Sequence, residues 1–102
     1  MSRNVIISKI AERKLDKLFD YLTTKWSIKV KNEFIEKLDK SILAIKEQPE
    51  SFPSSEKGKG LRKCVVTKQT TLYYRFNKNE IKIVTLFDTR KNPKKLNSDI
   101  KK

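Results

Sequence analysis

The sequence predicts an α+β domain in the order β-α-α-β-β-β, with one antiparallel sheet covered on one face by an N-terminal helical hairpin. Three observations predict it: helical spacing of apolar residues through 8–45, strand-like apolar runs through 61–87, and a Pro-, Gly- and Ser-rich loop over 49–60 between them. At 102 residues the chain has room for one core. We therefore expect a single domain spanning 1–102, with about 94–102 as a basic, flexible tail.

The N-terminal half is predicted to hold a short strand and two amphipathic helices. Residues 4–7 resemble a strand, and Ser8 and Ser27 are plausible N-caps of the helices that follow. Only a few residues around Trp26 separate the helices, so we expect an antiparallel hairpin that ends at Pro49. The two apolar faces are formed by Ala11, Leu15, Leu18, Phe19, Leu22 and Trp26, and by Val30, Phe34, Ile35, Leu38, Ile42 and Ile45.

Three strands are predicted after the loop, over 61–66, 70–76 and 81–87. Their short connections predict a meander of antiparallel hairpins. Alternation within the second of these strands places Tyr73 and Arg75 on the face opposite the helices. The residues expected to be largely buried are Leu15, Leu22, Trp26, Phe34, Leu38, Ile42, Leu72, Tyr74 and Ile83.

Composition excludes several kinds of chemistry. The chain has no His and one Cys, so zinc sites, Ser-His-Asp or Cys-His catalysis and an internal disulfide are not expected, and we predict no metal and no cofactor. The N-terminus has no apolar run longer than residues 5–7, so no membrane segment is expected and a cytoplasmic location is predicted.

The net charge of +13 is concentrated in the second half of the chain. Residues 51–102 carry 14 basic and 4 acidic side chains, against 11 and 8 in residues 1–50. Such a field attracts phosphates and acidic partners, and a guanidinium matches either of them while a base stacks on tyrosine. The alternative is that Tyr73 pairs across strands and Arg75 only solvates the sheet. The predicted target- or phosphate-binding residues are Lys57, Lys59, Arg62, Lys63, Tyr73, Arg75, Arg90 and Lys91.

The order of elements, together with the segments "AIKEQPESFP", "RKCVVTKQTTLYYRF" and "IKIVTLFDTRKNP", resembles the RelE/ParE superfamily of bacterial toxins from about Asn4 to about Pro93. The resemblance implies the toxin of a type II toxin–antitoxin, or plasmid-stabilisation, module. RelE-like members are ribosome-dependent endoribonucleases that cut mRNA. ParE-like members share the fold and inhibit DNA gyrase, a type II topoisomerase.

Position by position, the resemblance favours the ParE-like branch. Arg62 and Arg90 match basic positions of the ribonucleases, and both are expected to be exposed. Cys64 and Thr71 stand where those enzymes keep further basic residues. The C-terminal Tyr or His of the ribonucleases is missing, and Leu96 lies nearest to its position. The resemblance therefore implies an inhibitor without catalytic activity.

Two other functions remain open. If the chain is a ribonuclease, the candidate catalytic residues are Arg62, Arg75 and Arg90, with Asp88 or Glu56 as a substitute base. A basic nucleic-acid-binding module without toxicity is the third reading, and it needs exposed aromatic residues for base stacking.

The resemblance also implies a partner. Antitoxins of this superfamily are small, commonly acidic and encoded adjacently, and their C-terminal segment folds as it wraps the toxin, which suits a chain of charge +13. The target is DNA gyrase or the ribosome with its mRNA. A homodimer or a heterotetramer with the antitoxin is the expected assembly.

Overall fold

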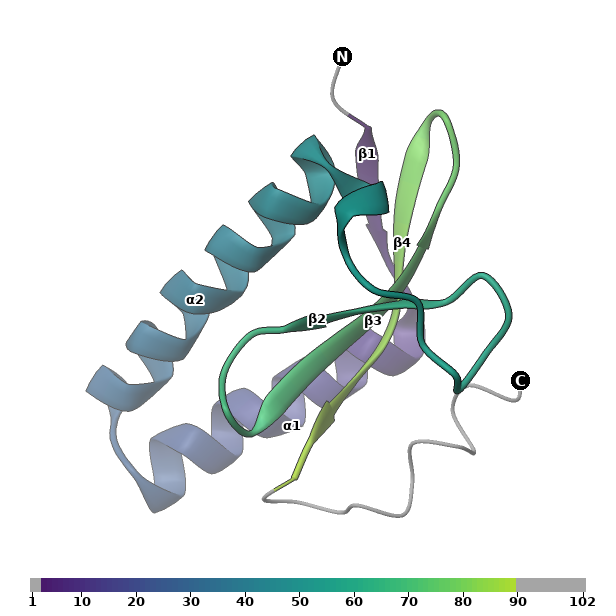
Figure 1. Ribbon diagram of the computed structural model, residues 1–102. Helices are drawn as coiled ribbons and strands as arrows, with labels where there is room; N and C mark the ends of the chain where they lie inside the picture. Colours follow the sequence, from purple (N-terminus) through teal and green to yellow (C-terminus); the bar gives the residue numbers. More distant parts are fainter. Residues whose placement is uncertain (1–2, 90–102) are drawn as a thin grey trace.

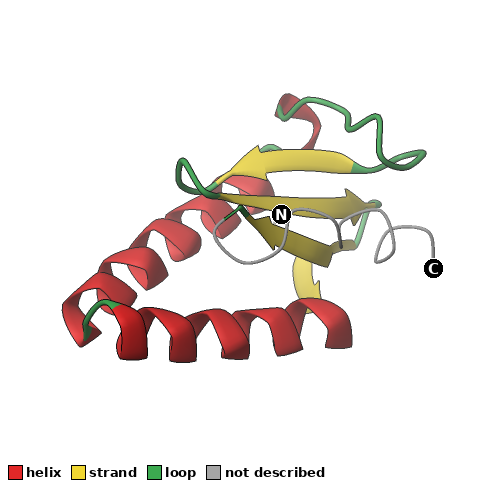
Figure 2. Ribbon diagram, turned by 90° about the horizontal axis from the view of Figure 1, so that it is seen from below, coloured by secondary structure: helices red, strands yellow, loops and turns green. Residues whose placement is uncertain are grey.

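The computed structural model describes residues 3–89, which form a four-stranded sheet and a helical hairpin packed on one of its faces (Figure 1, Figure 2). The predicted order of elements is confirmed. Arg90, Lys91 and the predicted tail over 94–102 lie outside the described residues. The elements are β1 (Asn4–Ile7), α1 (Lys9–Lys25), α2 (Ile28–Glu47), the 3-10 turn η1 (Pro49–Ser51), β2 (Arg62–Val65), β3 (Thr70–Phe76) and β4 (Glu80–Asp88).

The sheet is mixed, with the strand order β1-β4-β3-β2. The meander β2-β3-β4 is antiparallel, as predicted, whereas β1 lies parallel to β4. The prediction of a wholly antiparallel sheet is therefore wrong for β1. Strands joined by a tight turn must run antiparallel, but β1 and β4 are separated by the helices and two strands, so no turn sets their relative direction.

Both predicted helix N-caps are confirmed. The Ser8 hydroxyl oxygen accepts a hydrogen bond from the Ala11 N–H at 3.0 Å, and its O–H donates to the Val84 carbonyl at 2.6 Å, so the start of α1 is fixed to β4. The Ser27 hydroxyl accepts from the Val30 N–H at 3.1 Å. From the turn at Trp26 and Ser27 the two helices diverge as an open V (Figure 2).

The predicted core is largely confirmed, with two exceptions. Seven of the nine residues expected to be buried are buried, Ile42 is only partly buried, and Trp26 is 59% exposed. Trp26 is the C-cap of α1, with φ −121° and ψ −93°, so its side chain no longer follows the apolar face of the helix. The helices have also diverged from the sheet at this point, so the prediction of a buried Trp26 is wrong.

A β-bulge explains the continuous apolar run of β4. Tyr73 pairs with Thr85 and Tyr74 with Ile83, so Val84 is an extra residue on β4. The bulge changes the phase of the strand, because it inserts one residue without a direct partner. Ile83 before it and Leu86 after it both belong to the main core as a result.

Candidate functional site

The face of the sheet opposite the helices holds a small apolar cluster. Leu61 and Tyr73 are its buried members, and Val84 and Phe87 pack against them. Tyr73 is only 7% exposed, and burial raises the pKa of its hydroxyl. Tyr73 therefore packs across strands, as in the alternative reading, and little of its ring is exposed for stacking on a base.

Arg62 lies on the other face of the sheet. It pairs with Tyr74 in the antiparallel register, and directly opposed residues project from the same face. Its Nη1 donates to the carbonyl oxygens of Glu50, at 3.2 Å, and Phe52, and its guanidinium carbon lies 5.6 Å from the centre of the Phe76 ring. The expectation of an exposed Arg62 is wrong, because the side chain is half-buried and holds the η1 segment against the sheet.

Tyr74 holds the same segment from the core. Its hydroxyl donates to the Pro49 carbonyl at 2.6 Å, and its ring packs edge-on against Phe52 with the centroids 6.2 Å apart. Tyr74 is fully buried, and this burial raises its pKa to about 12, with the charge of Arg62 acting in the opposite direction. The neutral phenol is therefore part of the folded structure.

This pKa predicts an alkaline loss of stability. The folded-state value lies above the ordinary value of 10, so the stabilisation from Tyr74 is complete below pH 10 and is lost as the pH rises through 12. Over this range the free energy of unfolding should fall by up to roughly 2–3 kcal/mol more in the parent than in Tyr74→Phe, measured by urea titration. At pH 7 the variant should be less stable by about 1–2 kcal/mol, because the Pro49 carbonyl loses its donor. If the free energy of unfolding fell equally with pH in the parent and in Tyr74→Phe, the loss of stability could not be assigned to Tyr74.

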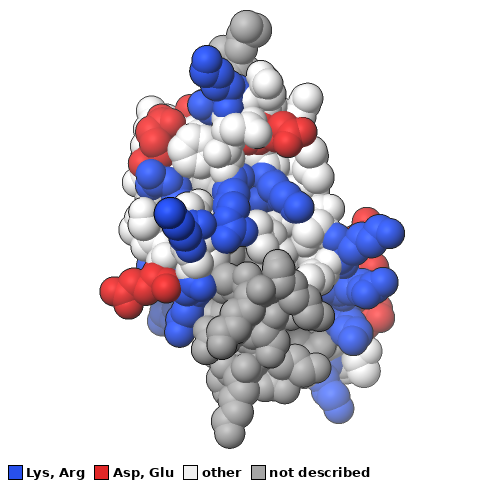
Figure 3. Space-filling view, turned by 90° about the vertical axis from the view of Figure 1, so that its right-hand side faces the viewer, with Lys and Arg blue, Asp and Glu red and all other residues white. Residues whose placement is uncertain are grey.

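Several basic residues do gather on the outer face of the sheet. The Nε and Nη2 of Arg75 each donate to the Lys59 carbonyl at 3.3 Å, and Lys82 is paired directly across from Arg75. Lys63 projects from the same face, opposite Tyr73. We call Lys59, Lys63, Arg75 and Lys82 the outer patch. Figure 3, which views the side away from α2, shows Lys and Arg side chains close together near its middle.

The outer patch contains three of the predicted binding residues and one that the sequence prediction missed. Lys82 could have been found by pairing the predicted strands, since it lies across from Arg75. Like charges opposed across two strands destabilise a sheet, which indicates a surface suited to a negatively charged partner. Lys57 is exposed in the loop before β2, where its N–H donates to the Ser55 hydroxyl at 3.1 Å.

Four further positions bear on the ribonuclease alternative: Cys64 and Thr71, which replace basic residues, and Asp88 and Glu56, the candidate substitute bases. Cys64 is buried in the main core, and burial raises the pKa of its thiol. Asp88 is buried and accepts a hydrogen bond from the Thr70 hydroxyl at 2.7 Å. Glu56 is exposed in the loop before β2, and Thr71 is half-buried on β3.

Within residues 3–89 no three metal-ligating side chains come together, and no helix there is long and apolar enough to span a membrane.

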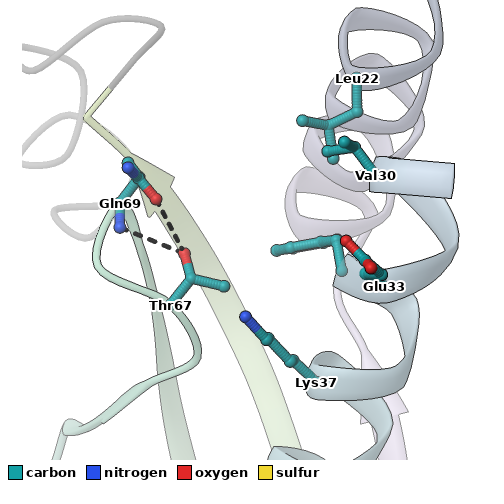
Figure 4. A pocket seen from close by; sticks show the side chains of 7 residues that line it. Leu22, Val30, Glu33, Lys37, Thr67 and Gln69 are labelled. Carbon is teal, nitrogen blue, oxygen red and sulfur yellow. Dashed lines mark hydrogen bonds between the residues drawn. The ribbon is translucent and has the colours of Figure 1, made fainter. Parts of the chain in front are cut away.

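A cleft of about 160 Å³ opens where the helices diverge from the sheet (Figure 4). Its apolar lining comes from the helices, and Lys37 reaches from α2 towards Thr67 on the β2–β3 turn. That turn is held by Thr67, whose hydroxyl accepts from the Gln69 and Thr70 N–H groups at 3.1 Å each. Periodicity alone does not reveal the cleft, because it depends on the angle between the helices. The lining residues are Leu22, Val30, Glu33, Phe34, Lys37, Thr67 and Gln69.

Comparison with known proteins agrees with this architecture. A chain in the solved structure of the chromosomal ParDE TA system from P. aeruginosa superposes with a TM-score of 0.71 at 13% sequence identity, covering 85% of this chain and 96% of that chain. This similarity shows a shared fold. A search of curated protein sequences finds no match. Residues 5–93 match the family model described as "ParE toxin of type II toxin-antitoxin system, parDE", so the chain belongs to the ParE family of type II toxins.

Proposed function

We propose that this protein acts in the cytoplasm by inhibiting a type II topoisomerase such as DNA gyrase, and that a cognate antitoxin neutralises it. The observation that carries the proposal concerns the two positions on β2 at which a ribonuclease would keep basic residues. There Arg62 donates to the carbonyls of Glu50 and Phe52, and Cys64 lies in the core.

The chemistry of RNA cleavage supports the same choice. In-line cleavage needs a base for the 2′-hydroxyl, a cation for the charged phosphorane and an acid for the leaving oxygen. Asp88 is buried and bound by Thr70, and Tyr73 is buried with a raised pKa, so neither is presented to a substrate. The outer patch supplies only cations. Such a surface favours binding of a negatively charged partner over proton transfer.

Two features of the surface support an antitoxin partner. The cleft between the helices and the β2–β3 turn has both apolar and polar lining residues, and a segment of a second protein could fill it on folding. Among the described strands β1 pairs with β4 alone, at the edge of the sheet, and its Ile6 and Ile7 are exposed. An added strand would find unpaired backbone groups there. The charge of +13 favours an acidic antitoxin and a fast, salt-sensitive encounter.

The proposal is tested with the purified protein in two assays. We expect it to inhibit DNA supercoiling by purified gyrase, and we expect addition of the acidic protein encoded beside its gene to restore supercoiling. In the second assay, primer extension on mRNA bound to translating ribosomes should show no new ends. Arg75→Ala, which removes a cation of the outer patch, is compared with the parent in the primer-extension assay.

Cuts at codon positions that disappear in Arg75→Ala and Arg90→Ala would overturn the proposal and assign the protein to the ribonuclease branch. Full supercoiling activity in the presence of a large excess of folded protein would also contradict it.

A further inference from the structure

The turn between the two helices exposes two large apolar side chains that are separated by one residue in the sequence. Trp26 is 59% exposed and Ile28 is 62% exposed, on either side of Ser27. We call residues 25–29 the hairpin tip. Figures 1 and 2 show that the turn lies at one end of the molecule, beyond the strands. Exposed apolar side chains in contiguous groups mark interaction surfaces more often than isolated ones do.

The fold makes little use of these two side chains. The turn is held by its backbone and by Ser27: the Trp26 N–H donates to the Leu22 carbonyl at 3.0 Å, and Ser27 caps α2. Neither Trp26 nor Ile28 belongs to the core cluster or lines the cleft. Their removal is therefore expected to leave the fold intact.

The charge around the tip indicates the chemistry of its partner. Between Asp20 and Glu33 the chain carries Lys25, Lys29 and Lys31 and no acidic residue. A partner that buries Trp26 and Ile28 therefore meets a segment that carries only positive charges, which is complementary to an acidic rim around an apolar pocket. A second copy of this chain, with its own charge of +13, lacks that complementarity.

The shape of the tip separates it from the proposed antitoxin surface. A cleft accepts a segment that folds as it binds, whereas a projecting turn needs a partner that already has a pocket, and such a pocket belongs to a folded protein. A membrane is less suitable, because the apolar faces of α1 and α2 are turned to the core and leave no long stripe for a lipid surface.

We infer that the hairpin tip is the surface that engages the toxin's target, by inserting Trp26 and Ile28 into an apolar pocket with an acidic rim. The inference rests on the proposed function, so the target tested is a type II topoisomerase. A Trp side chain fully buried at the centre of an interface commonly dominates the binding energy.

The test compares Trp26→Ser/Ile28→Ser with Leu43→Ser in the full-length protein. Leu43 is a matched control because it is 57% exposed on α2, well away from the tip in sequence. Both proteins should keep the parent's melting temperature to within about two degrees, as surface substitutions usually do. The tip variant should need at least about thirtyfold more protein to inhibit gyrase supercoiling, the loss expected from one truncated hot spot. Its affinity for the antitoxin should change less than about threefold, and Leu43→Ser should match the parent throughout.

Each of the following results would overturn the inference. Equal inhibition of gyrase by the tip variant and the parent would show that the target binds elsewhere, while the proposed function would stand. Loss of antitoxin binding with full inhibition would assign the tip to the antitoxin interface. Binding of the parent, but not the tip variant, to anionic phosphatidylglycerol vesicles with unchanged inhibition would assign it to a membrane. If the parent itself fails to inhibit gyrase, the proposed function fails first and the tip is not the binding site for that enzyme.

Discussion

Phe34→Ala should lower the free energy of unfolding by roughly 3–5 kcal/mol. Phe34 is only 4% exposed, and its ring meets Phe19 of α1 edge-on with the centroids 6.2 Å apart. It is one of the three buried residues that α2 contributes, with Leu38 and Ile45. Since domains of this size are stable by about 5–15 kcal/mol, the loss would be a large part of the total. Urea titration followed by circular dichroism measures it.

The control for this prediction is Trp26→Ala, at an exposed aromatic position of the hairpin. Because Trp26 is mainly exposed, its truncation should change stability by less than about 0.5 kcal/mol. If Trp26→Ala were as destabilising as Phe34→Ala, the turn would have to pack against the rest of the molecule. If Phe34→Ala were neutral, the contact between α1 and α2 would contribute little to folding.

The parts of the fold that depend on local signals could be predicted from the sequence. Ser8 and Ser27 cap the helices as expected, and the short connections of the meander impose antiparallel pairing. The direction of β1 could not be predicted, because hydrophobic alternation is the same in parallel and antiparallel strands. The bulge at Val84 leaves only a change of apolar phase between Ile83 and Leu86, which is hard to distinguish from a continuous buried run.

The candidate site was less predictable, since charge and residue type do not determine what a side chain contacts. Alternation places Arg75 correctly on the outer face. It cannot show that Tyr73 is covered by Leu61, or that Arg62 finds carbonyl partners in the segment before β2. These contacts depend on the path of the loop over 52–61. The exposure of Trp26 similarly depends on where the helix ends.

Arg62→Ala should lower the free energy of unfolding by about 2 kcal/mol or more. The substitution leaves the Glu50 and Phe52 carbonyls without their charged donor and removes the guanidinium from the Phe76 ring. Hydrogen bonds to charged groups contribute roughly 1.5–3 kcal/mol each when buried, and the partial exposure of Arg62 reduces that value. Arg62→Lys keeps the charge but cannot reach two carbonyls with a planar fork, so it should recover only part of the loss. Thermal and urea unfolding of the two variants beside the parent give the comparison.

Arg75→Ala provides the matched variant on the opposite face. Arg75 also donates to a carbonyl, that of Lys59, but through two longer and exposed contacts, and it faces Lys82 across the strands. Removing one of two opposed cations relieves repulsion, so we expect a change in stability of less than about 1 kcal/mol. Any loss of toxicity in Arg62→Ala should then follow its unfolding and return when the assay temperature is lowered. A fully stable Arg62→Ala protein that no longer inhibits its target would instead make Arg62 a contact residue, as the sequence first suggested.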